Sequence, residues 1–378
     1  MCLSTTGSVW LHRKCQNKED TMMKNRRLSK KVVSVLTVAA MGMALLAGCG
    51  DSGKDSGTTA ASSDDGGLTP VTIYGVTDPQ EAAQIIIAKE NGYFEEEGLD
   101  VTNKLIESSS DLPAYIASGE APVSAESQYT CTEVAAQGVK LKTLMTNSNT
   151  SNTQGLILGK GQTINSAKDL EGKTLGIMNG AGFMLAIQNM CKEMNVDIDK
   201  INIVYLSPSE QVAALENGSI DMMACWEPYM SQALDAGGTL LFTGVKSYFP
   251  EKTGDVDWLN FYSTFEVTED YYNENRDTCV KLVKAMTKAT DYINANLDEC
   301  AGIIAKELNN DKDAIYAIMA QNTYENIFDD TFEKAVNDMA QYMKDAGNID
   351  NVPDFDTYCD PSVLKEVKPE NATYEPSK

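Results

Sequence analysis

The sequence predicts an α/β protein built from two domains, and three observations support this prediction. Short β-branched or aromatic segments alternate with capped helices from about residue 68 onward, which is typical of parallel sheets with crossover helices. A polar run over 147–153 interrupts this alternation, which then resumes. The segment from residue 68 to 378 is also long for a single hydrophobic core.

Residues 1–48 are predicted to be a signal peptide with an upstream extension. A basic stretch from Lys24 to Lys31 precedes an uncharged run over 32–46, and small residues then lead to Cys49. This order is typical of an export signal. A transmembrane anchor is the alternative, although the run falls short of the ~20 residues that span a bilayer. Residues 49–67, rich in Gly, Ser, Thr and Asp, are predicted to be a flexible tether.

The chain after residue 48 is strongly acidic and lacks histidine. Its 23 basic and 53 acidic residues disfavour nucleic acid as a partner. The only histidine, His12, lies before the cleavage point, which excludes Ser-His-Asp and Cys-His catalysis in the remaining chain. Six cysteines follow Cys49 without C-x-x-C spacing, so they indicate no metal or redox motif, while disulfides and free thiols both stay open. We expect no cofactor, no metal and no enzymatic activity.

The first domain is predicted to begin with residues 68–158. Val71 to Gly75 is a β-branched and aromatic run that indicates a strand. Asp78 and Pro79 have the residue types of an N-cap and a first helical position, which predicts a helix reaching Gly92. The other predicted elements are strands over 99–106, 123–126 and 141–146 and helices over 112–117 and 132–137.

A crossing over 147–160 leads to the predicted second domain, residues 159–255. Ser207 and Glu210 form a capping-box pattern with proline between them, which predicts a helix that ends at Gly218. Residues 256–378 are predicted to return to the first domain, with a loose tail after Pro361. The other predicted elements are strands over 154–158, 174–178, 202–206, 220–225 and 258–267 and helices over 183–194, 279–293 and 332–343.

Four stretches within residues 70–300 give the chain a family resemblance. In their order and spacing they resemble the extracytoplasmic solute-binding proteins of ABC importers, in the nitrate, sulfonate and taurine group that also contains thiamine-pyrimidine-synthase-like proteins. The resemblance implies a type II periplasmic-binding-protein fold, with two α/β domains joined by two crossing segments and a ligand cleft between them. The stretches are AKENGYFEEEGLDV at 88–101, DLEGKTLG at 169–176, EQVAALENGSID at 210–221 and WEPY at 226–229.

The resemblance also has implications for location and partners. Leu46 to Cys49 resembles a lipobox, which implies that Cys49 carries a lipid and becomes the mature N-terminus. The protein is then expected outside the cytoplasm, anchored by its lipid to the bacterial cell membrane. Its expected partners are a small-molecule ligand and the permease and ATPase subunits of an ABC importer, and the protein itself is expected to be a monomer.

Ligands of open α/β sheets bind outside the carboxyl ends of the parallel strands. This rule predicts ligand contacts in the loops after the strands. Asp78 has an alternative role as a helix cap, whereas Trp226 is a candidate for stacking on a flat ligand. The predicted ligand-binding residues are Val76, Thr77, Asp78, Glu126, Ser127, Asn147, Asn149, Asn179, Gly180, Ala181, Gly182, Phe183, Trp226, Glu227, Tyr229 and Tyr262.

The charge of these loops favours one class of ligand. The glycines between Asn179 and Phe183 lie at a predicted helix start, which is a potential anion site. The loops nevertheless contain Asp78, Glu126 and Glu227 and no Lys or Arg. We therefore expect a neutral or cationic, partly aromatic ligand such as a pyrimidine vitamin precursor. The alternatives are a sulfonate, taurine or nitrate type of anion, or an enzyme or sensor with the same fold.

Overall fold

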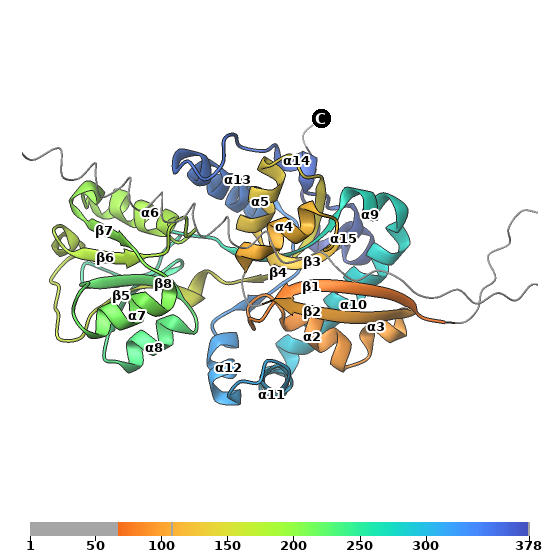
Figure 1. Ribbon diagram of the computed structural model, residues 1–378, viewed down its shortest axis with the longest axis horizontal. Coiled ribbons are helices and arrows are strands. Elements are labelled where there is room, and N and C mark those ends of the chain that lie inside the picture. Colours follow the sequence, from red (N-terminus) through yellow and green to blue (C-terminus); the bar gives the residue numbers. More distant parts are fainter. Residues whose placement is uncertain (1–66, 107–108, 377–378) are drawn as a thin grey trace, which may run out of the picture. The chain divides into compact units, whose positions relative to one another are not determined.

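The computed structural model describes residues 67–106 and 109–376, which form two β-sheets with helices packed against them (Figure 1). The signal peptide, the lipid attachment at Cys49 and the tether up to residue 66 lie outside the described residues. Across the described ranges, no helix combines the length and the apolar character needed to cross a membrane.

The first sheet has six strands in the order β13-β4-β12-β3-β1-β2. β1 pairs in parallel with β2 and β3, whereas β12 lies antiparallel between β3 and β4. The sheet therefore depends on a strand that the chain supplies only after it has built the second sheet. The strands are β1 (Thr69–Val76), β2 (Leu99–Ile106), β3 (Val123–Ser127), β4 (Leu141–Asn149), β12 (Tyr262–Thr268) and β13 (Thr323–Tyr324).

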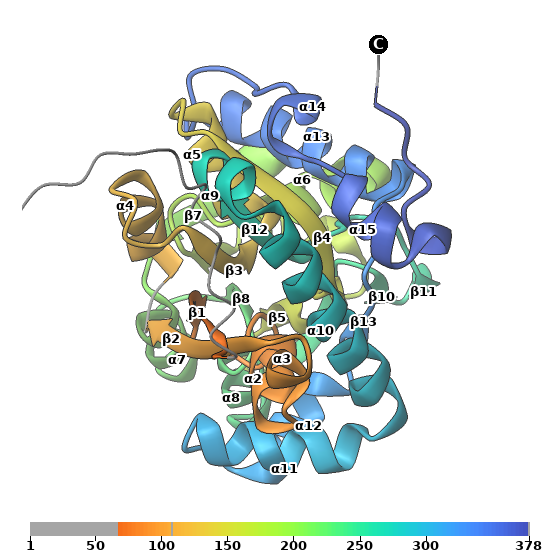
Figure 2. The same cartoon turned by 90° about the vertical axis from the view of Figure 1, so that its right-hand side faces the viewer.

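Helices from both ends of the described chain cover the first sheet. The long helix α10 packs against α2, α3 and α15, and in Figure 2 it runs in front of β12 and β4. Its Cys279, Leu282, Val283, Met286 and Ile293 are buried, as its helical spacing predicts. The helices are α2 (Ala83–Glu90), α3 (Tyr93–Glu96), α4 (Leu112–Ala117), α5 (Gln128–Ala136), α9 (Glu269–Glu274), α10 (Arg276–Ala295), α11 (Leu297–Glu307), α12 (Lys312–Met319), α13 (Asp330–Asp345), α14 (Phe355–Tyr358) and α15 (Ser362–Val367).

The second sheet has seven strands in the order β11-β10-β9-β5-β8-β6-β7. β5 pairs antiparallel with β8 and β9, so the chain changes sheet between residues 149 and 154, before the predicted boundary at 158. Its elements are β5 (Gln154–Leu158), β6 (Thr174–Ile177), α6 (Met184–Met194), β7 (Asn202–Tyr205), α7 (Pro208–Glu216), β8 (Met222–Trp226), α8 (Tyr229–Asp235), β9 (Thr239–Thr243), β10 (Lys246–Phe249) and β11 (Lys252–Asp255).

Both faces of the second sheet are covered by helices. Successive side chains of a strand point to opposite faces, so neighbouring residues of β5 pack in different clusters. Leu156 and Leu158 pack in one buried cluster with residues of α6, whereas Ile157 packs in another with residues of α7 and α8. Figure 1 shows α6 on one side of this sheet and α7 and α8 on the other. Because both faces of β5 are buried, its residues 156–158 are all apolar and do not alternate with polar residues.

The two segments that cross between the sheets are bonded to each other at Ser151. Its Oγ accepts a hydrogen bond from the Phe261 amide at 2.8 Å, and its carbonyl oxygen accepts one from the Gly244 amide at 2.9 Å. A Cβ at Gly244 would lie 2.8 Å from that carbonyl oxygen, so only glycine permits this approach. The crossings are therefore fixed side by side.

α13 contributes side chains to the cores of both sheets. Phe332 and Val336 belong to the buried cluster of the first sheet, whereas Met339, Tyr342 and Met343 belong to the buried cluster around α6. α10 therefore contributes to the core of the first sheet, whereas α13 contributes to both cores.

Several predicted elements differ from the structure: the helix predicted over 132–137 spans Gln128–Ala136, and the strand predicted over 258–267 spans Tyr262–Thr268. The helix predicted to start at Pro79 begins at Ala83, because Asp78 accepts hydrogen bonds from Gln80 in a turn that precedes the helix. The tail predicted to be loose after Pro361 contains α15 and packs on the first sheet, where Val363 and Leu364 are fully buried. The tail is mostly polar, so its composition did not predict that its few apolar residues pack in the core.

Candidate functional site

Four carboxyl groups gather at the ends of strands from both sheets. Asp78 and Glu81 follow β1, Glu126 is the penultimate residue of β3, and Glu227 follows β8. They are close enough for the charge of Asp78 to act on Glu81 and Glu126, and for the charge of Glu227 to act on Asp78. We call these four residues the carboxylate cluster.

Two members of the cluster are held by hydrogen bonds that link the sheets. Asp78 accepts from the Gln80 amide at 2.6 Å and from Gln80 Nε2 at 3.2 Å, and the same Nε2 donates to the Glu227 carbonyl oxygen at 3.5 Å. The Glu227 carboxylate accepts from the Ser231 amide at 3.0 Å and from Ser231 Oγ at 2.9 Å. Gln321, in the turn between α12 and β13, donates to Glu227 Oε1 at 3.4 Å. Gln80 and Gln321 thus fix Glu227 against the first sheet.

Glu126 lies deepest in the cluster and is 0% exposed. Its Oε1 accepts from the Ser127 amide at 2.8 Å, and the carboxyl of Glu81 lies close enough for the two charges to act on each other. Another buried carboxyl, Glu266 on β12, lies close enough to act on it electrostatically and accepts from Ser124 Oγ at 2.8 Å. Acidic groups therefore continue from the cluster into the sheet.

Burial raises the pKa of Asp78, Glu81, Glu126 and Glu266, because it penalises their charged forms. It raises the pKa of Asp78 to about 6 and that of Glu126 to about 7. The pKa of Glu81 is raised well above its ordinary value by burial and then by the charge of Glu126, and burial also raises that of Glu266. Within residues 67–106 and 109–376, no lysine or arginine forms an ion pair with any of them. A cationic group of a ligand would stabilise their ionised forms.

The cluster does not have the geometry of a metal centre. No group of three or more His, Cys, Asp or Glu side chains in the described part of the chain is arranged to hold a metal ion. The six cysteines after Cys49 are buried free thiols.

The other predicted contacts at the first sheet have local structural roles. Thr77 is exposed, and its Oγ1 donates to the Ile106 carbonyl oxygen at 3.1 Å. Val76 is buried, and Ser127 caps α5 by accepting from the Thr130 amide. Ser127 is also bonded to a member of the cluster, because its amide donates to Glu126.

The predicted residues near the crossings are largely occupied by contacts within the protein. Asn147 is 0% exposed, and its Nδ2 donates to the Thr264 carbonyl oxygen at 2.8 Å, which joins β4 to β12. Asn149 Oδ1 accepts from the amide and hydroxyl of Ser151. Tyr262 is buried edge-to-face against Phe332, with ring centroids 5.5 Å apart. Tyr262 therefore packs in the core.

The glycine loop before α6 is in contact with helices of the first sheet. The carbonyl oxygen of Ala181 accepts from the Tyr342 hydroxyl of α13 at 3.1 Å. A Cβ at Gly182 would lie 3.0 Å from Phe261 and 3.2 Å from Met339, so the backbone approaches these side chains closely. α13 and the second crossing thus cover Ala181 and Gly182.

The remaining residues of this loop differ in exposure. Asn179 is exposed, and Gly180 has a φ of +76° and lies beside Tyr129 and Asn348, which are hydrogen-bonded to each other at 3.0 Å. Phe183 is 1% exposed and stacks on Phe242 in the core of the second sheet. Its burial makes Phe183 a packing residue in this conformation.

Trp226 and Tyr229 lie beside Glu227 and are half-buried. Their rings meet edge-to-face with centroids 6.5 Å apart. Trp226 is the last residue of β8, so its ring lies at the carboxyl end of this strand. Both rings also pack against the buried cluster around Ile157 and Met230.

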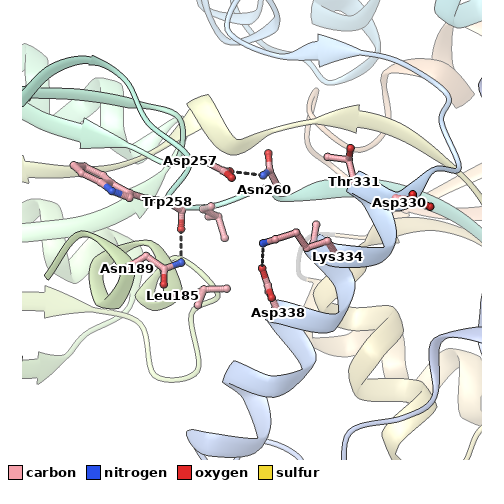
Figure 3. A pocket seen from close by; sticks show the side chains of 11 residues that line it. Leu185, Asn189, Asp257, Trp258, Asn260, Asp330, Thr331, Lys334 and Asp338 are labelled. Carbon is pink, nitrogen blue, oxygen red and sulfur yellow. Dashed lines mark hydrogen bonds and ion pairs between the residues drawn. The ribbon is translucent and has the colours of Figure 1, made fainter. Parts of the chain in front are cut away.

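A cavity of about 230 Å³ lies elsewhere, between α6, the second crossing and α13 (Figure 3). Asn189 and Trp258 line one side of this cavity, and Lys334 and Asp338 form an ion pair on the other. None of the predicted ligand-binding residues lines it.

Sequence reasoning missed Glu81, Gln80, Gln321 and Glu266. Glu81 falls within the helix predicted from Pro79 to Gly92, so the sequence pattern indicates no role for it at the strand end. Gln321 and Glu266 come from distant segments, and no local pattern places them near β1. Only the fold brings these residues together.

Two α/β halves joined by two crossings, with polar side chains at the strand ends, define the class of type II periplasmic-binding-protein folds. A solved structure, the periplasmic aliphatic sulphonate binding protein SsuA from Escherichia coli, shares this fold with a TM-score of 0.64 and 14% identity, over 82% of this chain and 93% of that one. A family model described as NMT1/THI5 like matches residues 80–300. The chain belongs to this family.

Two relatives match most of the chain. One, from Bacillus subtilis strain 168 and named for binding aliphatic sulfonates, is 25% identical over 339 residues, which cover 87% of this chain and 95% of the relative. The other, the taurine-binding periplasmic protein of Escherichia coli K12, is 23% identical over 297 residues, 74% of this chain and 88% of the relative.

An enzyme also shares the fold. The desulfurization enzyme DSZB has a TM-score of 0.59 and 13% identity, over 80% of this chain and 99% of the enzyme. At this identity the likeness concerns the fold alone.

Proposed function

We propose that this protein is the extracytoplasmic solute-binding component of an ABC importer and that it delivers a small organic solute to the permease. Its family, its fold and the names of its relatives support this function. Two domains closing on the ligand would provide capture and release. A lipid at Cys49 would hold the protein at the membrane, and Cys49→Ala should move it from the membrane fraction to the soluble fraction.

The names of the relatives favour the alternative ligand class, a sulfonate or taurine type of compound, over a pyrimidine precursor. The carboxylate cluster adds a second requirement, a positive charge. We therefore propose a small zwitterion of the aminosulfonate type, whose ammonium lies among the four carboxyl groups. Its apolar part would contact the aromatic surface of Trp226 and Tyr229.

The carboxylate cluster is the observation that carries this proposal. Asp78, Glu81, Glu126 and Glu227 act on one another, and no lysine or arginine of the described residues pairs with them. At an effective dielectric constant near 20, one ammonium about 4 Å from one carboxylate gains about 4 kcal/mol of Coulomb energy. A sulfonate without an ammonium would instead be repelled by the cluster.

A panel of four compounds separates these ligand classes. Taurine carries both charges, ethanesulfonate only the anion, ethylamine only the cation, and a hydroxymethylpyrimidine an aromatic ring without either. Thermal melting of residues 50–378 should show stabilisation by taurine, and a ligand at ~100 times its dissociation constant adds about 2.7 kcal/mol. Stabilisation by ethanesulfonate and not by taurine would contradict the requirement for a cation.

Variants of the cluster test where the ammonium binds. Asp78→Asn and Glu227→Gln should each weaken taurine binding at least tenfold in calorimetry, because each removes one negative charge. Glu90→Gln, at an exposed end of α2, is the matched control and should leave the affinity unchanged. Unchanged affinity in both cluster variants would place the ligand elsewhere.

A further inference from the structure

The cavity of about 230 Å³ between α6, the second crossing and α13 has walls that are fixed by hydrogen bonds (Figure 3). Asn189 Nδ2, on α6, donates to the Trp258 carbonyl oxygen of the crossing at 2.9 Å. The crossing and α13 are joined by the buried Gln128, whose Nε2 donates to the carbonyl oxygens of Asn260 at 3.2 Å and Ala335 at 3.1 Å. The fold therefore forms this cavity in advance, and a ligand would bind without rearranging its walls.

Negative charge is in excess on these walls. Three carboxyl groups and one ammonium line the cavity, which leaves two negative charges unbalanced; they belong to Asp257, Asp330, Asp338 and Lys334. Lys334 is paired with Asp338 at 2.5 Å, and the charge of Asp257 also acts on it. Asp257 and Asp330 form no ion pair within the described part of the chain. A cation is therefore the charge that complements the cavity.

The volume and the rest of the lining limit the shape of this cation. Leu185, Leu259 and Ala335 give the cavity an aliphatic surface, and the last two of them are buried. The volume lies below the range of about 300–1,000 Å³ that is typical of pockets for drug-sized ligands. A short aliphatic chain with an ammonium at each end meets both conditions, because it supplies two positive charges and an apolar middle.

We propose that this cavity is a second ligand site, which binds a small aliphatic diamine with one ammonium at Asp257 and the other at Asp330. The methylene groups of the diamine lie against Leu259 and Ala335. The ligand contacts α6 of the second sheet as well as α13, so it bridges elements on both sides of the crossing. The site shares no residue with the carboxylate cluster and does not depend on the proposed function.

NMR titration of ¹⁵N-labelled residues 50–378 with 1,4-diaminobutane tests this site. We expect saturable shifts of the backbone amide resonances of Leu259 and Ala335. 1,4-Butanediol has a chain of the same length without charge and should cause no saturable shift at these amides. If diaminobutane shifts only the resonances of the carboxylate cluster, or if butanediol binds as tightly as the diamine, the proposed site is refuted.

Two variants test the charges of the site. Asp257→Asn and Asp330→Asn should each weaken diaminobutane binding at least about fivefold, because each removes one of the charges that attract the diamine. Both residues are exposed, so the variants should fold. Asp313→Asn is the matched control, because Asp313 is exposed in the first turn of α12 as Asp330 is in that of α13, and it should leave the affinity unchanged.

Unchanged affinity in both cavity variants would overturn the diamine site. Taurine that fails to bind would contradict the proposed function alone, because Asp257 and Asp330 lie outside the carboxylate cluster. The two proposals can therefore fail separately.

Discussion

At the residue scale, Gly238 shows how tightly the second sheet is packed. A Cβ at this position would lie 2.7 Å from Ile157 Cγ2 and 2.8 Å from the Ala233 carbonyl oxygen, and the carbonyl oxygen belongs to a helix backbone that cannot move aside. We predict that Gly238→Ala lowers the free energy of unfolding by about 1–3 kcal/mol, the usual result of overpacking. Urea denaturation measures this change.

The control for this prediction is Gly302, in the interior of α11. A Cβ there would meet only the flexible side chain of Lys312, at 3.6 Å. Gly302→Ala should leave the stability unchanged or raise it by up to about 1 kcal/mol, because alanine loses less conformational entropy in a helix. If the two variants lose equal stability, the contact at Gly238 is not the cause.

At the scale of elements, the contact between α13 and the glycine loop depends on the Tyr342 hydroxyl. Tyr342 is 6% exposed and donates to the carbonyl oxygen of Ala181. Tyr342→Phe leaves this carbonyl without its donor and should lower the free energy of unfolding by about 1 kcal/mol. Tyr316→Phe, at an exposed position of α12, is the matched control and should have no measurable effect. Equal losses in both variants would contradict a role for this bond.

Elements with a local signature were predictable from the sequence. The strand over 99–106, the helix over 112–117 and the strand over 154–158 have the predicted bounds, because each is a regular run closed by glycine or polar residues. The hairpin of β10 and β11 was missed, since its alternation is short and polar. The pairing of β12 between β3 and β4 is a contact between distant segments, which no periodicity reveals.

The candidate site was predictable only in part. The strand-end rule led to Asp78, Glu126 and Glu227, because the carboxyl ends of strands are visible in the sequence. The same rule also included Phe183 and Tyr262, two large aromatic residues whose side chains are buried in the hydrophobic cores. Glu81 escaped notice because only the fold brings it near the charge of Glu126, a residue on another strand.

At the scale of the whole molecule, the buried carboxyl groups determine how stability depends on pH. The folded state raises the pKa of Asp78 from 3.8 to about 6 and that of Glu126 from 4.5 to about 7. Between about pH 4 and pH 7 the folded state therefore binds more protons than the unfolded state, so stability falls as pH rises through this window. Groups with a lowered pKa, such as Glu171 at about 2, act in the opposite direction below pH 4.5.

We therefore predict that the melting temperature of the ligand-free protein is highest near pH 5 and decreases toward pH 8. Scanning calorimetry in 0.5 M NaCl measures this dependence while it screens the repulsion due to net charge. Glu126→Gln should give a shallower decrease, because it removes one of the titrating groups. A melting temperature that rises from pH 5 to pH 8 would contradict the burial of these carboxyl groups.

The place of β12 in the first sheet has a consequence for the order of folding. β12 separates β3 from β4, yet it follows the whole of the second sheet in the chain. A chain that emerges with its N-terminus first can pair β1 with β2 and β3 and complete the second sheet, from β5 to β11, while β4 still waits for residues 262–268 to join it to β3. The first sheet is thus begun before the second and completed after it, and until then the apolar strand β4 and the open edge of β3 depend on protection from aggregation.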